Sequence, residues 1–289
     1  ATQVLVQHRP RGGVSVGGYV SAPICRAARH LKIPVVTCSY DSKPGMATKM
    51  QARYAATVAV AHTPSTLRRA QLTGAPVRAE LRHLDRGASR AASRMRLGFS
   101  ADAKLVVVMG GSLGSAVLNS ATESLVAQME SPSLANVAIL HIAGSRYMEG
   151  QQLASEMRRP DGSMMYQRIA YSSNMSDIYA AADLVVARAG ASTVAEIATV
   201  GIASVLVPWK DAAENHQLTN AKSLSDPGGA VLLEESKLAD DVFVQLIGDL
   251  LGDESMRLHI ANEARKLGEV HRNCSIAAVV EKAADGVVR

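Results

Sequence analysis

Residues 104–119 have the sequence KLVVVMGGSLGSAVLN. An apolar run of strand type at 104–109 is followed by a glycine-rich turn, and from residue 115 the pattern is that of a helix. A strand that is apolar throughout is typical of a parallel sheet covered on both faces. The turn places backbone N–H groups at a helix N-terminus, which suits a phosphate group. A tight turn without a ligand, in which Ser112 merely caps the helix, is the alternative.

The same alternation of β-branched runs and alanine-rich stretches extends along the chain. It favours βαβ units and parallel sheets. Strands are predicted at 35–37, 57–61, 104–109, 137–141, 164–168, 184–187, 204–208 and 230–233, and helices at 22–31, 45–54, 115–128, 150–159, 175–181, 193–199 and 214–224. Three further helices, with no strand between them, are predicted at 238–251, 254–267 and 275–287.

The net charge of the 289 residues is divided unevenly along the chain. Residues 1–97 carry 16 basic and 3 acidic side chains, a net +13, whereas residues 98–289 carry 15 and 23, a net −8. Such a division suggests two domains with different partners. We expect a partial N-terminal domain at 1–81, a basic linker with some helix at 82–97, and a second domain at 98–289. The second domain ends in a helical tail whose last helix could pack back on the first domain.

Composition and missing motifs exclude several classes of protein. The hydrophobic fraction of 47% excludes a disordered chain, and no apolar run approaches the ~20 residues of a membrane span. Cys25, Cys38 and Cys274 form no CxxC pair, which argues against a zinc site or disulfide scaffold and fits a reducing cytoplasm. One Trp, two Phe and seven Tyr leave few groups for stacking on nucleic acid. The sequence has no DxD, G-x-S-x-G or H-E-x-x-H motif, so we expect no metal and no cofactor.

Two other turns could also bind an anion. Gly17, Gly18 and Tyr19 precede a helix that has Pro23 in its first turn, where its missing N–H costs nothing. The segment 187–196, ARAGASTVAE, joins a strand to a helix. In each case a plain turn is the alternative.

The carboxylate of Glu196 has two competing interpretations. Thr193 and Glu196 are three residues apart, which is the spacing of a capping box. A glutamate beside a phosphate-binding helix N-terminus can instead accept hydrogen bonds from a ribose diol, as an acidic group does in dinucleotide folds. Further on, His216 and Gln217 follow the strand at 204–208, where open α/β sheets bind ligands. They could bind sugar hydroxyls or simply be solvated.

Taken in order, several segments resemble the bacterial UDP-N-acetylglucosamine transferases of peptidoglycan synthesis, the MurG family. The matching segments are GGYVSAP at 17–23, IPVV at 33–36, PG at 44–45, TGAPVR at 73–78, GGSLGSAVLN at 110–119, ADLVVARAGASTVAEIA at 182–198 and NHQLTNA at 215–221. The resemblance implies a GT-B fold: two Rossmann-like, doubly wound α/β domains that face each other across a cleft.

The resemblance also implies the reaction. N-acetylglucosamine would pass from UDP to the 4-hydroxyl of an undecaprenyl-diphospho-muramoyl-pentapeptide (lipid I to lipid II), with inversion and without a metal. The enzyme would be peripheral, on the cytoplasmic face of the plasma membrane, with its basic half on an anionic lipid surface. The family's N-terminal GGTGGH loop, with its His, has no counterpart here. The first domain is therefore expected to be incomplete and the chain alone inactive, and no catalytic residue is named.

Site residues are carried over from the family to matching positions. Ser112 and the backbone of Thr193 would hold the UDP phosphates, Glu196 the ribose, and the segment 171–175 the uracil. Arg78, His216 and Gln217 would contact the sugar. The whole expected donor set is Arg78, Gly111, Ser112, Leu113, Gly114, Ser172, Met175, Ala191, Ser192, Thr193, Glu196, His216, Gln217 and Asp41. Gly17, Gly18 and Tyr19 would bind the acceptor diphosphate.

Two residues depart from the family pattern. Asp41 replaces an Asn that contacts the donor sugar, and Leu113 replaces a Gln in the glycine loop. These changes motivate an alternative, a related GT-B transferase with another sugar nucleotide or lipid acceptor. The unmatched N-terminal loop motivates a second alternative, a non-catalytic nucleotide-binding module.

Overall fold

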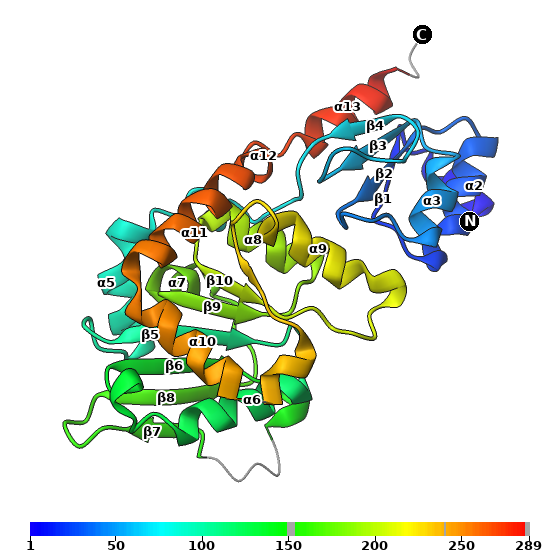
Figure 1. The fold of residues 1–289 in the computed structure, drawn as a ribbon. Helices are drawn as coiled ribbons and strands as arrows, with labels where there is room; N and C mark the ends of the chain where they lie inside the picture. Colours follow the sequence, from blue (N-terminus) through cyan, green and yellow to red (C-terminus); the bar gives the residue numbers. More distant parts are fainter. Residues whose placement is uncertain (149–153, 240, 287–289) are drawn as a thin grey trace.

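The computed structural model describes residues 1–148, 154–239 and 241–286, which form two α/β units, each built on its own sheet (Figure 1). The smaller unit has four parallel strands in the order β1-β2-β3-β4. Its elements are β1 Gly13–Ser15, β2 Val35–Ser39, β3 Thr57–Val60, β4 Ala70–Leu72, α1 Thr2–His8, η1 Tyr19–Ser21, α2 Ala22–His30 and α3 Met46–Ala52. Within the described residues, no helix is long and apolar enough to span a bilayer.

The larger unit has seven strands in the order β11-β10-β9-β5-β6-β8-β7, all parallel except for the β7–β8 pair. Its strands are β5 Lys104–Met109, β6 Val137–Ile142, β7 Glu156–Arg158, β8 Met164–Ile169, β9 Leu184–Ala187, β10 Ser204–Leu206 and β11 Val231–Leu232. Its helices are α4 Ala79–Arg82, α5 Arg86–Leu97, α6 Ala116–Ala127, α7 Met175–Ala181, α8 Ala191–Val200, α9 His216–Ser225, α10 Asp241–Gly252, α11 Glu254–Leu267 and α12 Glu269–Arg272. The short turns are η2 Pro132–Leu134, η3 Ser145–Tyr147, η4 Ala213–Asn215 and η5 Glu235–Ala239.

Helices cover both faces of the larger sheet, because alternate side chains of a strand point to opposite faces. On the central strand β5, Leu105 and Val107 belong to a core that includes Ile178 of α7 and Ile197 of α8. Val106 and Val108 belong to the other core, with residues of α6 and α10. This double cover explains why β5 is apolar throughout.

Helix α13, Ile276–Asp285, ends the described chain and packs on the smaller sheet (Figure 1). Val279 of α13 shares a core with Val36 of β2 and Ala59 of β3. The opposite face of β2 packs on α2, through Val35 and Cys25. The chain therefore passes between the units twice. At this crossing the backbone N–H of Ala75 donates to His271 Nδ1 at 3.0 Å.

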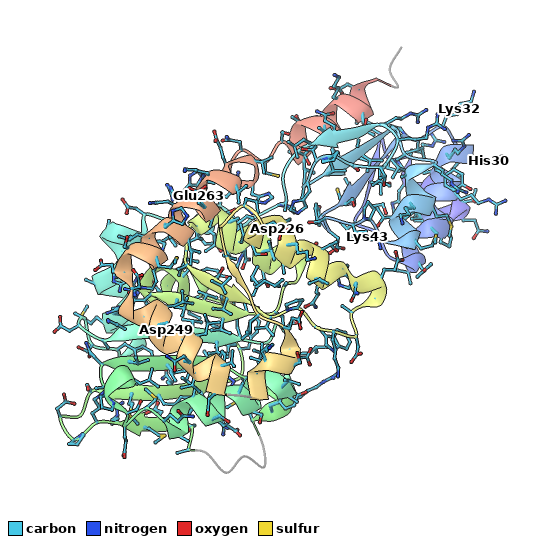
Figure 2. All side chains as sticks on the ribbon, in the orientation of Figure 1. His30, Lys32, Lys43, Asp226, Asp249 and Glu263 are labelled. Carbon is cyan, nitrogen blue, oxygen red and sulfur yellow. The ribbon has the colours of Figure 1, made fainter. Side chains whose placement is uncertain are left out.

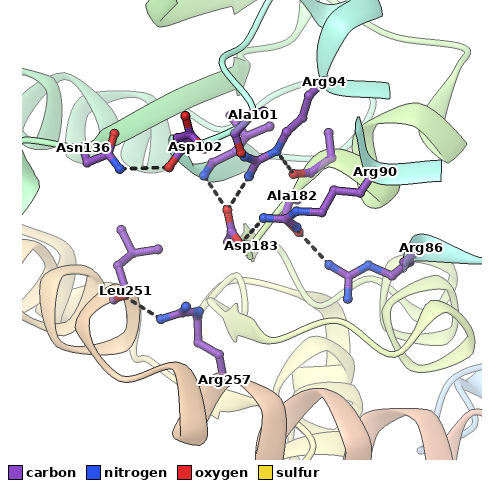
Figure 3. A network of polar contacts seen from close by, with 12 residues as sticks. Arg86, Arg90, Arg94, Ala101, Asp102, Asn136, Ala182, Asp183, Leu251 and Arg257 are labelled. Carbon is purple, nitrogen blue, oxygen red and sulfur yellow. Dashed lines mark hydrogen bonds and ion pairs between the residues drawn. The ribbon is translucent and has the colours of Figure 1, made fainter. Parts of the chain in front are cut away.

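Arginines attach α5 to the larger unit (Figure 3). Arg94 donates to the carbonyl of Ala181 at 3.0 Å and to Asp183 at 2.6 Å. Arg86 donates to the carbonyls of Tyr179, Ala182 and Gly201 at 3.1, 2.6 and 3.1 Å. These carbonyls lie near the C-terminal ends of α7 and α8, where helices carry partial negative charge. The segment 82–97, expected to be a linker with some helix, is thus mostly a well-anchored helix.

The predicted strands and most predicted helices are confirmed, with ends that differ by a few residues. The helix predicted at 150–159 is wrong: residues 149–153 lie outside the described part, and Glu156–Arg158 form β7, which pairs with the edge of β8. Strands β1 and β4 were not predicted. The division into domains at 81 and 97 stays a prediction.

Candidate functional site

The carboxyl ends of the parallel strands β5, β6, β8 and β9 meet at one edge of the larger sheet. A cavity of about 370 Å³ lies at this edge. It is lined by Arg78, Met109, Gly111, Ser112, Ile142, Tyr171, Ser172, Met175, Tyr179, Ser192, Thr193 and Glu196. The structure therefore brings together eight of the fourteen residues predicted for the donor site, from segments up to 118 residues apart.

The glycine loop after β5 forms one wall of this cavity, and its shape requires glycine. Gly111 and Gly114 have φ of +87° and +79°, which L side chains rarely adopt. A Cβ on Gly114 would lie 2.1 Å from the carbonyl oxygen of Ala143. Ser115, not Ser112, caps α6 by accepting from the N–H of Leu118 at 3.4 Å. The hydroxyl of Ser112 is therefore not used as a helix cap.

Glu196 lies on the second turn of α8, with its carboxylate at the cavity. The helix begins at Ala191 with Gly190 as its N-cap and no side-chain cap, so the capping-box interpretation is wrong. Glu196 accepts from the Tyr179 hydroxyl at 3.0 Å and from Arg78 Nη2 at 3.4 Å. Burial raises the pKa of Glu196, while the contacts with Tyr179 and Arg78 oppose the shift.

Another wall of this cavity consists of the loop before α7 and the first turn of that helix. Asn174 caps α7, accepting from the N–H of Asp177 at 3.3 Å. The hydroxyl of Ser172 accepts from the N–H of Asn174 at 3.2 Å. Arg78 donates to the carbonyl of Ser173 at 3.3 Å, so the same arginine contacts this loop and Glu196.

A second cavity of about 490 Å³ shares Gly111 and Ser112 with the first. Its other lining residues are Gly110, Leu113, Gly114, Ser115, Ala116, Val117, Arg146, Tyr147, Arg188, Trp209, Gln217 and Glu235. Arg188 donates to the hydroxyl of Ser115 at 2.8 Å and pairs with Glu235 at 3.1 Å. Gln217 accepts from the N–H of Trp209 at 3.0 Å. The two cavities thus meet at the glycine loop.

Sequence reasoning missed several of these residues, among them three that make polar contacts at the cavities. Tyr179, Arg188 and Glu235 line the cavities, and only Arg188 carries a signal, a charged residue directly after the apolar strand β9. Tyr179 and Glu235 are recognised through their tertiary contacts alone.

Some predicted residues lie elsewhere. Ala191 and His216 are not among the lining residues of either cavity, and His216 Nδ1 lies 2.7 Å from the carbonyl oxygen of Ala213. Asp41, on the smaller unit, accepts a hydrogen bond from Asn220 of α9 at 2.8 Å.

The residues predicted for the acceptor lie on the smaller unit. Gly17 and Gly18 have φ of +91° and +78°. Ser21 and the buried Gln51 donate to their carbonyls at 2.8 and 2.7 Å, respectively. Tyr19 lines a separate cavity of about 740 Å³ with Arg26 and His30. Among the described residues, no group of three or more His, Cys, Asp or Glu could hold a metal ion.

Known proteins show the same architecture. The family model of the glycosyltransferase family 28 C-terminal domain matches residues 105–272. The chain is 37% identical over 271 residues to the UDP-N-acetylglucosamine--N-acetylmuramyl-(pentapeptide) pyrophosphoryl-undecaprenol N-acetylglucosamine transferase of Acidothermus cellulolyticus, covering 94% of this chain and 72% of that protein. The enzyme of the same name from Paenarthrobacter aurescens is 35% identical over 272 residues, covering 93% and 70%.

Solved structures agree. The crystal structure of MurG from Acinetobacter baumannii has a TM-score of 0.75 and 25% identity, and the match covers 97% of this chain and 76% of that one. The glycosyltransferase of kitacinnamycin has a TM-score of 0.69, with 14% identity, over 97% and 78%. The second similarity is one of fold alone. Both agree with the expected GT-B fold.

Proposed function

The chain belongs to the MurG family of glycosyltransferases, and from that membership we propose that it transfers N-acetylglucosamine from UDP-N-acetylglucosamine to an undecaprenyl-diphosphate-linked muramoyl-pentapeptide. The observation that carries the proposal is the pair of cavities joined at the glycine loop. One has the polar groups that a uridine diphosphate needs, and the other adjoins it where the sugar would continue.

In this proposal the first cavity holds the nucleotide. The carboxylate of Glu196 accepts hydrogen bonds from the ribose diol, held in place by Arg78 and Tyr179. The backbone of the segment around Ser172 and Met175 contacts the uracil. Hydrogen bonds to an ionised carboxylate are stronger than hydrogen bonds to a neutral acceptor. The carboxylate of Glu196 is half-buried.

The glycine loop stabilises the leaving group in this mechanism. When the sugar–phosphate bond breaks, negative charge develops on the β-phosphate of UDP. The glycine loop with Ser112, which leads into α6, and the N-terminal end of α8 with Thr193 line the cavity and supply backbone N–H groups and partial positive charge to it. Fixed dipoles of this kind lower the barrier because they need no reorganisation during the reaction.

The second cavity would hold the sugar, between Gln217, Trp209 and Leu113. Leu113 is 56% exposed and offers no hydrogen bond. This observation favours a second candidate, a transferase of the same fold with another sugar nucleotide.

A calorimetric donor panel separates the two candidates. UDP-N-acetylglucosamine is expected to bind more tightly than UDP-glucose. A one-group difference at a sugar site changes affinity by about 1–3 kcal/mol, roughly 5- to 150-fold. Tighter binding of UDP-glucose would favour the second candidate, and no binding of any UDP-sugar would contradict both.

The smaller unit would face the lipid acceptor and the cytoplasmic leaflet. It carries exposed apolar side chains, including Val16, Tyr19 and Val20, near Arg26 and Arg29. Figure 2 labels His30, Lys32 and Lys43 on this unit and Asp226, Asp249 and Glu263 on the larger one. Basic residues near anionic lipid contribute roughly 1 kcal/mol each. Binding to phosphatidylglycerol vesicles should weaken with salt; binding indifferent to salt and lipid charge would contradict this orientation.

A further inference from the structure

Asn220 is a fully buried polar residue on α9 that joins the two units. Its Nδ2 donates to Asp41 Oδ1 at 2.8 Å, and its Oδ1 accepts from the backbone N–H of Ser42 at 2.8 Å. Asp41 and Ser42 follow strand β2 of the smaller unit. The same Nδ2 donates to the carbonyl of Ala189 at 3.3 Å, just before α8. One amide thus fixes the loops after strands of two different sheets.

The segment just ahead of α9 adds a second link between the units, through the side chain of Glu214. Glu214 Oε1 accepts from the backbone N–H of Met46, at the start of α3, at 3.2 Å. Glu214 and Asn215 both have positive φ, at 53° and 57°. Such conformations cost free energy in residues other than glycine and persist only where the surroundings hold them. Two links therefore connect the segment 214–220 to the smaller unit.

The same segment borders the cavity proposed for the sugar. Gln217 lies between Glu214 and Asn220 and lines that cavity with Trp209. The carboxylate of Asp41 uses Oδ1 for Asn220, and its Oδ2 has no hydrogen-bond partner in the described part of the chain.

We propose that Asn220 is a positioning residue: it ties the loop after β2 of the smaller unit to α9 and so holds Gln217 of the same helix at the cavity proposed for the donor sugar. This inference rests on the proposed function. It explains how Asp41 serves in place of the amide expected there: its bond to Asn220 needs only an acceptor, which Asp and Asn both supply. It also makes the extra affinity contributed by the sugar depend on Asn220 more than UDP binding does, because neither Asn220 nor Asp41 lines the nucleotide cavity.

The test compares four variants by calorimetry with UDP and with UDP-N-acetylglucosamine. Asn220→Ala and Asp41→Ala each remove the link, and Asp41→Asn keeps an acceptor for Asn220. Thr219→Ala is the matched control, because Thr219 bonds only to carbonyls of its own helix start. The readout is the ratio of the two dissociation constants, which a general loss of structure would not change selectively.

In Asn220→Ala and Asp41→Ala we expect the ratio to shift against UDP-N-acetylglucosamine by about 3- to 10-fold, the range for one lost hydrogen bond. UDP affinity should stay within about twofold, and Thr219→Ala should resemble the unmodified protein. In Asp41→Asn the ratio should change less than in Asp41→Ala, because an acceptor for Asn220 is kept. Asn220 is buried, so Asn220→Ala can fail to fold. In that case Asp41→Ala, which removes the same hydrogen bond, supplies the measurement. The proposal is overturned if the ratio does not change in the folded variant, or if UDP affinity falls as much as that of the sugar nucleotide.

Small-angle scattering makes this test independent of the proposed function. If the unmodified protein binds no UDP-sugar, the proposed function fails, but the link between the units can still be measured. Loss of the link should increase the radius of gyration of Asp41→Ala relative to Thr219→Ala. Identical scattering curves would overturn the link.

Discussion

At the scale of single residues, we propose the carboxylate of Glu196 as the group on which nucleotide recognition depends. Its neighbours Tyr179 and Arg78 hold it at the cavity, and burial raises its pKa. Because the ionised form is the better acceptor, UDP affinity should rise with pH as the carboxyl group loses its proton.

Glu196→Gln should weaken UDP binding by about tenfold, since a hydrogen bond to a charged group is worth roughly 1.5–3 kcal/mol. The melting temperature should change little, because the Tyr179 hydroxyl can still donate to the amide oxygen. The control is Glu80→Gln, which removes the other carboxylate that pairs with Arg78, a more exposed contact at 3.6 Å. Calorimetry measures the UDP affinity of both variants, and thermal melts measure their stability. Equal UDP affinity in both variants, or a loss of stability without a loss of affinity, would remove Glu196 from the site.

Several site residues could be predicted from the sequence because local pattern places them. Ser112 lies in the glycine-rich turn after β5 and Thr193 in the first turn of α8, which soon follows β9, so the chain itself brings them to the sheet edge. The contacts of Asn220 could not be predicted from local pattern. Its partners lie 179 and 31 residues away, and only the fold shows that they meet.

At the scale of elements, α5 is held by charged groups on one side. Asp183 accepts from Arg94 at 2.6 Å and from the N–H of Leu105 at 2.7 Å, and it also pairs with Arg90. The Arg94 side chain is only 2% exposed. A buried arginine that loses its carboxylate keeps the full cost of its desolvation.

Asp183→Ala should therefore lower the free energy of unfolding by about 3–5 kcal/mol. Asp85→Ala is the matched control: it removes only the N-cap of the same helix, whose carboxylate accepts from Ala88 at 3.1 Å. That change should cost about 1 kcal/mol. Urea denaturation measures both. A loss in Asp183→Ala no greater than in Asp85→Ala would show that the arginine contacts do not anchor α5.

Strands could be predicted well where four or more consecutive residues are apolar, as in β5 and β9. The short edge strands could not. Glu156–Arg158 has no apolar period, and its pairing with β8 decides its conformation. Helix α8 begins two residues before the predicted start, at Ala191, and this shift is what removed the capping box.

At the scale of the whole molecule, the uneven charge corresponds to two units with separate tasks. The basic unit carries the glycine turn with Tyr19, and the acidic one carries the two joined cavities. The connections at Asn220 and His271 hold these units against each other. The donor should therefore lie on the larger unit, with its sugar directed toward the smaller one.

A crystal structure of the protein with UDP-N-acetylglucosamine tests this requirement most directly. We expect the ribose hydroxyls to lie on Glu196, the diphosphate on the Gly111–Gly114 turn, and the sugar between Gln217 and Asp41. A nucleotide bound away from Glu196, or a sugar that points away from the smaller unit, would contradict it.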